Sequence, residues 1–144
     1  MVLCDTNVWM ALSLSRHSQH HLAQSWLDTV DTPGSIWFCR ATQQSFLRLL
    51  TNKSVLGAFG NPPLSNRQAI HVYESLLSDD RIGLVVPEPP GLESCWRQYA
   101  CRDTASPKLW MDAYLAAFAI TGGYQLVTND SAYRQFAGLN LAVL

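Results

Sequence analysis

The amino-acid sequence predicts an α/β protein, a three-layer α/β/α sandwich whose mostly parallel central sheet has about five strands. The first observation behind this prediction is a series of short apolar runs, bounded by Gly, Pro, Asp or Asn, that are typical of buried strands. The second is that segments with helical periodicity separate these runs. Strands that alternate with helices form parallel sheets covered on both faces. The length of 144 residues and the hydrophobic content of 48% suit a single domain, 1–144.

The predicted strands are Val2–Cys4, Ile36–Cys39, Ile82–Val86, Gln125–Thr128 and Asn140–Leu144. Branched or aromatic residues occur in each of them, as is typical of strands. The stretch 57–65 lacks this pattern and is expected to be a loop, and the prolines of PEPPG at 87–91 indicate a rigid connector.

The predicted helices are His20–Val30, Thr42–Leu50, Asn66–Leu77 and 107–121. The third opens with the capping-box spacing Ser65-x-x-Gln68. The fourth has the most complete punctuation, because Ser106 precedes it as a cap, Pro107 takes its first position and two glycines follow its last turn.

The composition excludes some classes of protein. With a formal net charge of −1, any nucleic-acid contact must come from a local patch. The longest apolar stretch, 113–120, is far shorter than the ~20 residues that cross a bilayer, and Asp5 interrupts the apolar amino terminus. We therefore expect neither a membrane span nor a secretory signal. The cysteines lack C-x-x-C spacing and are expected to be reduced and mostly buried, in a cytoplasmic protein: Cys4, Cys39, Cys95 and Cys101.

Three aspartates stand in apolar surroundings. Asp5 directly follows the first predicted strand, Asp130 follows the strand Gln125–Thr128, and Asp112 lies in the second turn of the apolar helix 107–121. Ligands of parallel α/β sheets bind at the carboxyl ends of the strands, where these side chains could converge. Carboxylates with few neighbouring cations repel one another, so a divalent cation, Mg²⁺ or Mn²⁺, is expected among them.

Each aspartate also has a purely structural explanation. Asp5 could form an Asx turn at the strand end, Asp130 could cap a helix over Ser131–Phe136, and Asp112 could be a lone buried acid bonded to backbone groups. The prediction of a metal site therefore depends on all three residues meeting at one edge.

The same residues carry a resemblance to a known family. DTNVW at 5–9, ATQQSFLRLLTN at 41–52, WMDAYLAAFA at 110–119 and LVTND at 126–130 occur in this order over the whole chain. Together they resemble the PIN-domain ribonucleases of the VapC toxin type. The resemblance implies a helix-covered parallel sheet, an acidic centre that binds Mg²⁺ or Mn²⁺ to cleave RNA, an antitoxin partner and a homodimer.

The resemblance also assigns roles to residues. Asp5, Asp112 and Asp130 match the family's metal-binding aspartates, and Asn7 and Thr128 match positions that orient them by hydrogen bonds. A cation held by carboxylates lowers the pKa of a bound water and acts as a Lewis acid on a phosphodiester. We therefore expect hydrolysis by a metal-activated water, without a covalent nucleophile.

One position departs from the family pattern. The early helix usually carries a glutamate before an F/L-L-R run, but this chain has Gln43-Gln44-Ser45-Phe46-Leu47-Arg48 there. Alignment on FLR places Ser45 at the glutamate position, whereas helical spacing puts Gln43 on the inward face. Both residues remain candidates.

Substrate contacts are expected from the cations that flank the predicted centre in the sequence. Arg48 and Lys108 are the preferred pair, and the others are Arg40, Lys53 and Arg134. The histidines of RHSQHH at 16–21 are expected to lie on the surface at a helix start rather than to bind zinc, because no partner ligands exist elsewhere. The apolar residues around Trp37, Phe59 and Trp96 are candidates for the surfaces of dimer and antitoxin contacts.

Two other functions remain as alternatives. A PIN fold whose centre has decayed through the missing glutamate would bind RNA or protein without cutting it. An α/β phosphatase with an aspartyl nucleophile is disfavoured, because no second aspartate follows Asp5 two residues on.

Overall fold

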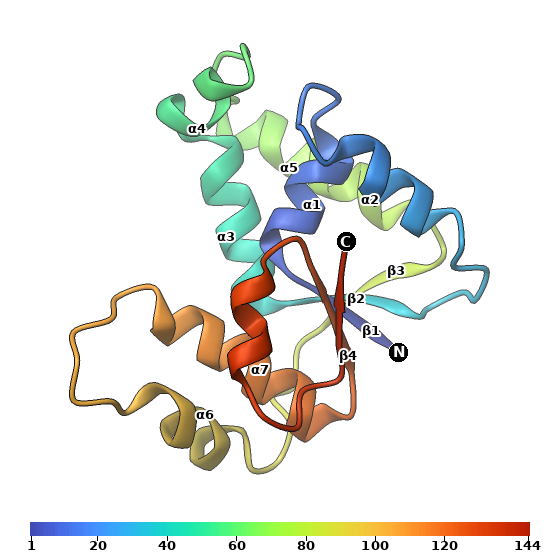
Figure 1. Cartoon of the computed structure of the whole chain (residues 1–144). Coiled ribbons are helices and arrows are strands. Elements are labelled where there is room, and N and C mark those ends of the chain that lie inside the picture. Colours follow the sequence, from blue (N-terminus) through green and yellow to red (C-terminus); the bar gives the residue numbers. More distant parts are fainter.

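A five-stranded sheet in the order β3-β2-β1-β4-β5 forms the centre of the computed structural model, which describes residues 1–144 (Figure 1). Its strands are β1 (Val2–Cys4), β2 (Ile36–Cys39), β3 (Ile82–Val85), β4 (Gln125–Thr128) and β5 (Leu141–Val143). All neighbouring strands pair in parallel. The predicted fold class is confirmed, and the sheet is entirely rather than mostly parallel.

Helices cover both faces of the sheet, so that α1 to α5 group on one side of it and α6 and α7 on the other (Figure 1). The helices are α1 (Thr6–Ser13), α2 (His20–Leu27), α3 (Arg40–Leu50), α4 (Lys53–Ala58), α5 (Asn66–Leu77), α6 (Leu92–Ala100) and α7 (Leu109–Gly122), and a 3₁₀ helix, η1, spans Ser131–Gln135. No helix is long and apolar enough to cross a membrane.

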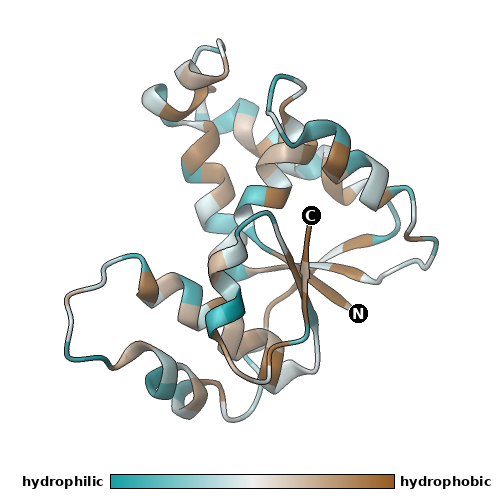
Figure 2. Ribbon diagram, viewed as in Figure 1, coloured by the Kyte–Doolittle hydropathy of each residue, from teal (hydrophilic) through white to brown (hydrophobic).

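Alternation along the strands divides the core into two halves. Side chains of a strand point to opposite faces in turn, so Ile36 and Phe38 of β2 pack toward α1 to α5, whereas Cys39 packs toward α6 and α7. Figure 2 shows that the central strands are mostly hydrophobic. On the first face, Trp9 of α1 stacks on Phe38 with ring centroids 3.7 Å apart. These contacts fix α1, and with it the residues that follow β1.

Three helices were not predicted from the sequence. α1 follows β1 without a loop and is buried along most of its length, so it lacks an amphipathic period and looks like a continuation of the strand. α4 is short and begins at the Asn52 cap, and its last two residues lie in the stretch predicted as a loop. α6 buries Leu92 and Ala100, as many residues as α5 buries, but it follows Gly91 without a side-chain cap such as the one that marks the start of α5.

Several predicted boundaries were wrong. α7 begins at Leu109 rather than at residue 107, and Ser106 accepts a turn hydrogen bond from the Leu109 backbone instead of capping the helix with its side chain. Asp112 therefore lies in the first turn, near the positive end of the helix dipole. The predicted stop at the two glycines is confirmed to within one residue, because α7 ends at Gly122 and Gly123 terminates it with a φ of 69°. Smaller shifts affect other boundaries: α2 ends before the predicted Val30, α3 begins before the predicted Thr42, β3 ends before the predicted Val86, and β5 is shorter at both ends than the predicted Asn140–Leu144.

The cysteines form no disulfide. Cys4 and Cys39 are buried, as predicted, but Cys95 is half-buried and Cys101 is exposed. Cys101 lies just beyond the end of α6, where no helix covers the chain.

Candidate metal centre

The strand order reverses between β1 and β4, because β2 and β3 are added on one side of β1, and β4 and β5 on the other. The connection from β1 to β2 runs over one face through α1 and α2, whereas β4 is reached over the other face through α6 and α7. Such a switch point leaves a crevice at the carboxyl ends of the two strands. Asp5 follows β1 directly and Asp130 stands two residues after β4, and both line one open pocket with Asp112 from the start of α7.

Asp5 is the most buried of the three carboxylates, with 8% of its surface exposed. One oxygen accepts a hydrogen bond from the Thr6 backbone at 2.6 Å, and the other accepts from the Thr128 hydroxyl at 2.8 Å. The pKa of Asp5 is raised to about 6, chiefly by burial. The two hydrogen bonds oppose this shift, and the charges of Asp112 and Asp130 add to it. A cation beside Asp5 would therefore relieve an unfavourable buried charge.

A hydrogen-bond network joins the ends of β1 and β4. The side chain of Asn7 makes both bonds: its Nδ2 donates to the Thr128 hydroxyl at 3.1 Å, and its Oδ1 accepts from the Asn129 backbone N–H at 3.2 Å. The Thr128 oxygen also accepts from the Asp130 backbone at 3.0 Å. Thr128 is fully buried, so these bonds hold the Asp5 carboxylate and the Asp130 backbone in a fixed relation.

Asp112 reaches the pocket from α7 and is half-buried. Its carboxylate accepts a hydrogen bond from the Tyr133 hydroxyl at 3.4 Å. Burial raises the pKa of Asp112, and the neighbouring Lys108 opposes this effect. Tyr133 was not predicted as a site residue, because its only signal in the sequence is an aromatic side chain three positions after Asp130.

Lys108, predicted to bind substrate, supplies a positive charge beside the carboxylates. Its ammonium group lies 2.6 Å from Asp130 Oδ2 and 3.8 Å from Asp112 Oδ2. The hydrogen bond from Lys108 holds the pKa of Asp130 below its usual value. The carboxylates are therefore partly compensated within the chain, but the Lys108 side chain stays 71% exposed and can move away.

The side chains fit a hydrated, hard divalent cation. No three His, Cys, Asp or Glu side chains lie close enough together to hold a metal ion unaided. Mg²⁺, however, usually keeps several waters and is held by one or two carboxylates. The pocket offers this donor set, because buried Asp5 and half-buried Asp112 carry raised pKa values and share an opening to solvent with Asp130.

The structure distinguishes the two candidates on α3. Ser45 lines the carboxylate pocket, whereas Gln43 does not and instead accepts a hydrogen bond from Arg40. Of the two open candidates, only Ser45 therefore borders the aspartates, because the face of α3 that Gln43 shares with Phe46 and Leu50 packs on the helices of its own layer.

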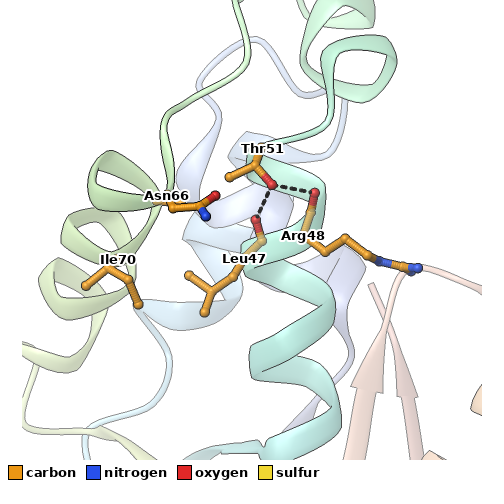
Figure 3. A pocket seen from close by; sticks show the side chains of 6 residues that line it. Leu47, Arg48, Thr51, Asn66 and Ile70 are labelled. Carbon is orange, nitrogen blue, oxygen red and sulfur yellow. Dashed lines mark hydrogen bonds between the residues drawn. The ribbon is translucent and has the colours of Figure 1, made fainter.

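Among the predicted substrate cations, Arg48 and Lys108 line the pocket, and Arg40, Lys53 and Arg134 do not. Arg48 also borders a groove between α3 and α5, where the Thr51 hydroxyl donates to the Leu47 and Arg48 carbonyls at 3.1 Å each. In Figure 3 the Arg48 side chain extends away from Ile70 and Asn66, out of that groove. Its guanidinium is therefore free to serve the carboxylate pocket.

Two expectations about the surface need correction. His17, expected in an exposed cluster, lines the carboxylate pocket and stacks on Phe59. Trp37, Phe59 and Trp96 are all half-buried, whereas the large exposed side chains near the pocket are Trp110 and Met111.

Comparisons with known proteins identify the family of the chain. The PIN domain family model matches residues 2–139. The chain is 59% identical to Ribonuclease VapC41 of Mycobacterium tuberculosis (strain H37Rv), over 100% of this chain and 99% of that protein.

Solved structures share the fold at low sequence identity. The FitAB complex bound to an IR36 DNA fragment matches with a TM-score of 0.65 and 20% identity, over 99% of this chain and 94% of that one. VapBC2 from Rickettsia felis, bound to a promoter DNA fragment, matches with a TM-score of 0.63 and 13% identity, over 99% and 98%. The sarcin-ricin loop cleaving toxin VapC20 of M. tuberculosis matches with a TM-score of 0.62 and 17% identity, over 96% and 98%.

Because the family model covers nearly the whole chain and a full-length relative shares more than half of its residues, the protein belongs to the PIN-domain family and, within it, to the VapC ribonucleases.

Proposed function

We propose that this protein is a Mg²⁺- or Mn²⁺-dependent endoribonuclease whose hydrated metal is bound among Asp5, Asp112 and Asp130, by direct coordination or through the waters of the ion. The observation that carries the proposal is the meeting of these carboxylates in one pocket at the switch point of the sheet. The bound cation would supply an activated water and a Lewis acid for hydrolysis of the RNA phosphodiester.

The chain's own groups prepare the site for this reaction. Thr128 and the Thr6 backbone orient the Asp5 carboxylate, and Asn7 in turn anchors Thr128. Tyr133 orients Asp112 from the buried side. Arg48 is exposed at the pocket and can hold a substrate phosphate, and Lys108 can do so once it leaves Asp130.

Asp5→Asn tests this function. The variant keeps a side chain of similar shape and should fold, but we expect no Mg²⁺-dependent cleavage of total RNA because the most buried ligand charge is lost. Wild type with EDTA is the matched control for the metal. Cleavage by Asp5→Asn at the wild-type rate would contradict the assignment of Asp5.

We further propose that the protein is the toxin of a toxin–antitoxin pair, that it acts in the cytoplasm and that it forms a homodimer. Support for a partner comes from the structural neighbours, which include VapBC and FitAB toxin–antitoxin complexes. A small neighbouring gene whose product copurifies with this chain and suppresses its cleavage would establish the pair.

A second candidate function is binding without cleavage. It is favoured by Ser45, which lines the pocket where the family resemblance places a glutamate. The two functions differ in one result, because only the ribonuclease produces new RNA ends when Mg²⁺ or Mn²⁺ is added.

A further inference from the structure

The carboxylate pocket is lined by two chemically different regions. The carboxylates lie at the edge of the sheet together with polar and basic side chains, whereas the part of the wall that reaches α4 is formed by aliphatic and aromatic side chains: Met10, His17, Leu49, Val55 and Phe59. In Figure 1, α4 lies at the end of α3 that is distant from the sheet. A ligand that fills the pocket therefore needs a charged part and a flat apolar part.

His17 and Phe59 form a stacked pair in the apolar region. Their ring centroids are 4.9 Å apart and their planes differ by 25°. His17 comes from the loop between α1 and α2, and Phe59 caps the end of α4. Next to this pair, Arg16 donates a hydrogen bond to the Gly60 carbonyl at 3.4 Å. These two contacts hold the loops together, so the aromatic wall is formed before a ligand arrives.

His17 is suited to a neutral, planar ligand. Its Nδ1 accepts a hydrogen bond from the Gln19 backbone at 3.1 Å, so the ring proton of the neutral form is on Nε2, where it can be donated. Burial lowers the pKa of His17, and the nearby His20 lowers it further. Both effects favour the uncharged form of the ring.

We propose that the His17–Phe59 pair is the subsite for an unpaired nucleobase of the RNA substrate, beside the phosphate that is cleaved. This inference rests on the proposed ribonuclease function and extends it to substrate recognition. Proteins hold single-stranded RNA by stacking its bases on aromatic rings and by binding its phosphates with cations. In this pocket a stacked pair, the exposed Arg48 and the carboxylates share one cavity.

The other aromatic cluster meets these requirements less well. Trp96, Trp110 and Tyr114 line a neighbouring groove that contains no carboxylate and no cation. A base bound there would lie outside the cavity that holds the aspartates.

RNA binding in EDTA tests the proposal without requiring cleavage. The probes are a fluorescently labelled single-stranded RNA oligonucleotide and a backbone of the same length that carries abasic tetrahydrofuran units. Wild type should bind the RNA about 5- to 150-fold more tightly than the abasic backbone, which is the range expected for stacking of one base. Phe59→Leu should lose most of this preference, because it should weaken binding of the RNA but not of the abasic backbone. Phe59→Tyr keeps an aromatic ring and should retain the preference.

His17→Leu and His21→Leu form a matched pair, because both residues belong to the segment RHSQHH but only His17 lines the pocket. His17→Leu should weaken RNA binding and relax the base preference next to the cleaved bond, as read from the sequenced ends of digested total RNA. His21→Leu should change neither.

The results separate this inference from the proposed function. Base-dependent binding that falls in Phe59→Leu supports the subsite even if no metal induces cleavage, in which case the ribonuclease proposal fails alone. If Phe59→Leu remains folded and binds RNA and the abasic backbone with wild-type affinities, the subsite is overturned. If a protein partner that inhibits wild type also failed to inhibit this Phe59→Leu variant, the aromatic wall would instead be a binding surface for that partner.

Discussion

At the scale of single residues, Lys108 sets the charge balance of the carboxylate pocket. It lies within 4 Å of carboxylate oxygens of both Asp130 and Asp112, where a divalent cation would also be attracted. A tethered ammonium group and a cation compete for the same negative charge, so the proposed Mg²⁺ would bind more weakly because it has to displace Lys108.

Lys108→Met should therefore tighten Mg²⁺ binding, because it removes the competing charge but keeps an unbranched side chain at this exposed position. Isothermal titration calorimetry should show a lower Kd for Mg²⁺ than in wild type, even if cleavage falls through loss of a phosphate contact. Lys53→Met is the control, since Lys53 lies outside the pocket. Weaker Mg²⁺ binding in Lys108→Met would show that Lys108 supports the metal instead of competing with it.

The raised pKa of Asp5 predicts how stability depends on pH without metal. The folded protein binds the Asp5 proton more tightly than the unfolded chain, so the free energy of unfolding falls as the pH rises from about 4 to about 6. The loss is at most about 3 kcal/mol. Thermal melts in EDTA should show this fall in wild type and a flatter profile in Asp5→Asn. Saturating Mg²⁺ should make the stability of wild type depend less steeply on pH. If wild type and Asp5→Asn showed the same dependence of stability on pH in EDTA, the raised pKa of Asp5 would be refuted.

At the scale of elements, the first turn of α7 and the middle of α3 face the same pocket, but only α7 contributes an acid. Asp112 comes from α7, and α3 presents Ser45 at the corresponding place. Replacing Ser45 would therefore change the charge of the pocket without disturbing the aspartates on the other elements.

Ser45→Glu should tighten Mg²⁺ binding and raise the cleavage rate at limiting Mg²⁺, because it adds a carboxylate to the pocket. Gln43→Glu is the matched control on the same helix. It lies outside the pocket and should alter stability by no more than about 0.5 kcal/mol and metal affinity not at all. Equal metal responses in both variants would mean that long-range charge, rather than position in the pocket, determines affinity.

At the scale of the whole molecule, one exposed apolar surface remains beside the pocket. Trp110 is 52% and Met111 41% exposed, and they border a groove with Trp96 and Tyr114. Apolar surface of this kind, rich in aromatic residues, is typical of protein interfaces. It is the surface that best suits the proposed homodimer.

Light scattering at tens of micromolar should give twice the mass of one chain for wild type and the mass of one chain for Trp110→Lys, which would place charges at the centre of this surface. Leu22→Lys, at an exposed site on α2, is the control and should remain a dimer. A monomeric wild type would count against the homodimer, and a dimeric Trp110→Lys would move the interface elsewhere.

The sequence by itself determined the strands, the parallel sheet and the three aspartates that meet at its edge. It could do so because apolar runs and their end points are local patterns, and because parallel strands bring their carboxyl ends to one side. α1 was missed because it is buried almost throughout, and α6 because no capping side chain marks its start after Gly91. Only the tertiary structure decided that Ser45 rather than Gln43 lines the pocket, that Lys108 pairs with Asp130, and that His17 stacks on Phe59. These contacts join residues from separate elements, and their geometry depends on how helices pack across the sheet, which no local pattern encodes.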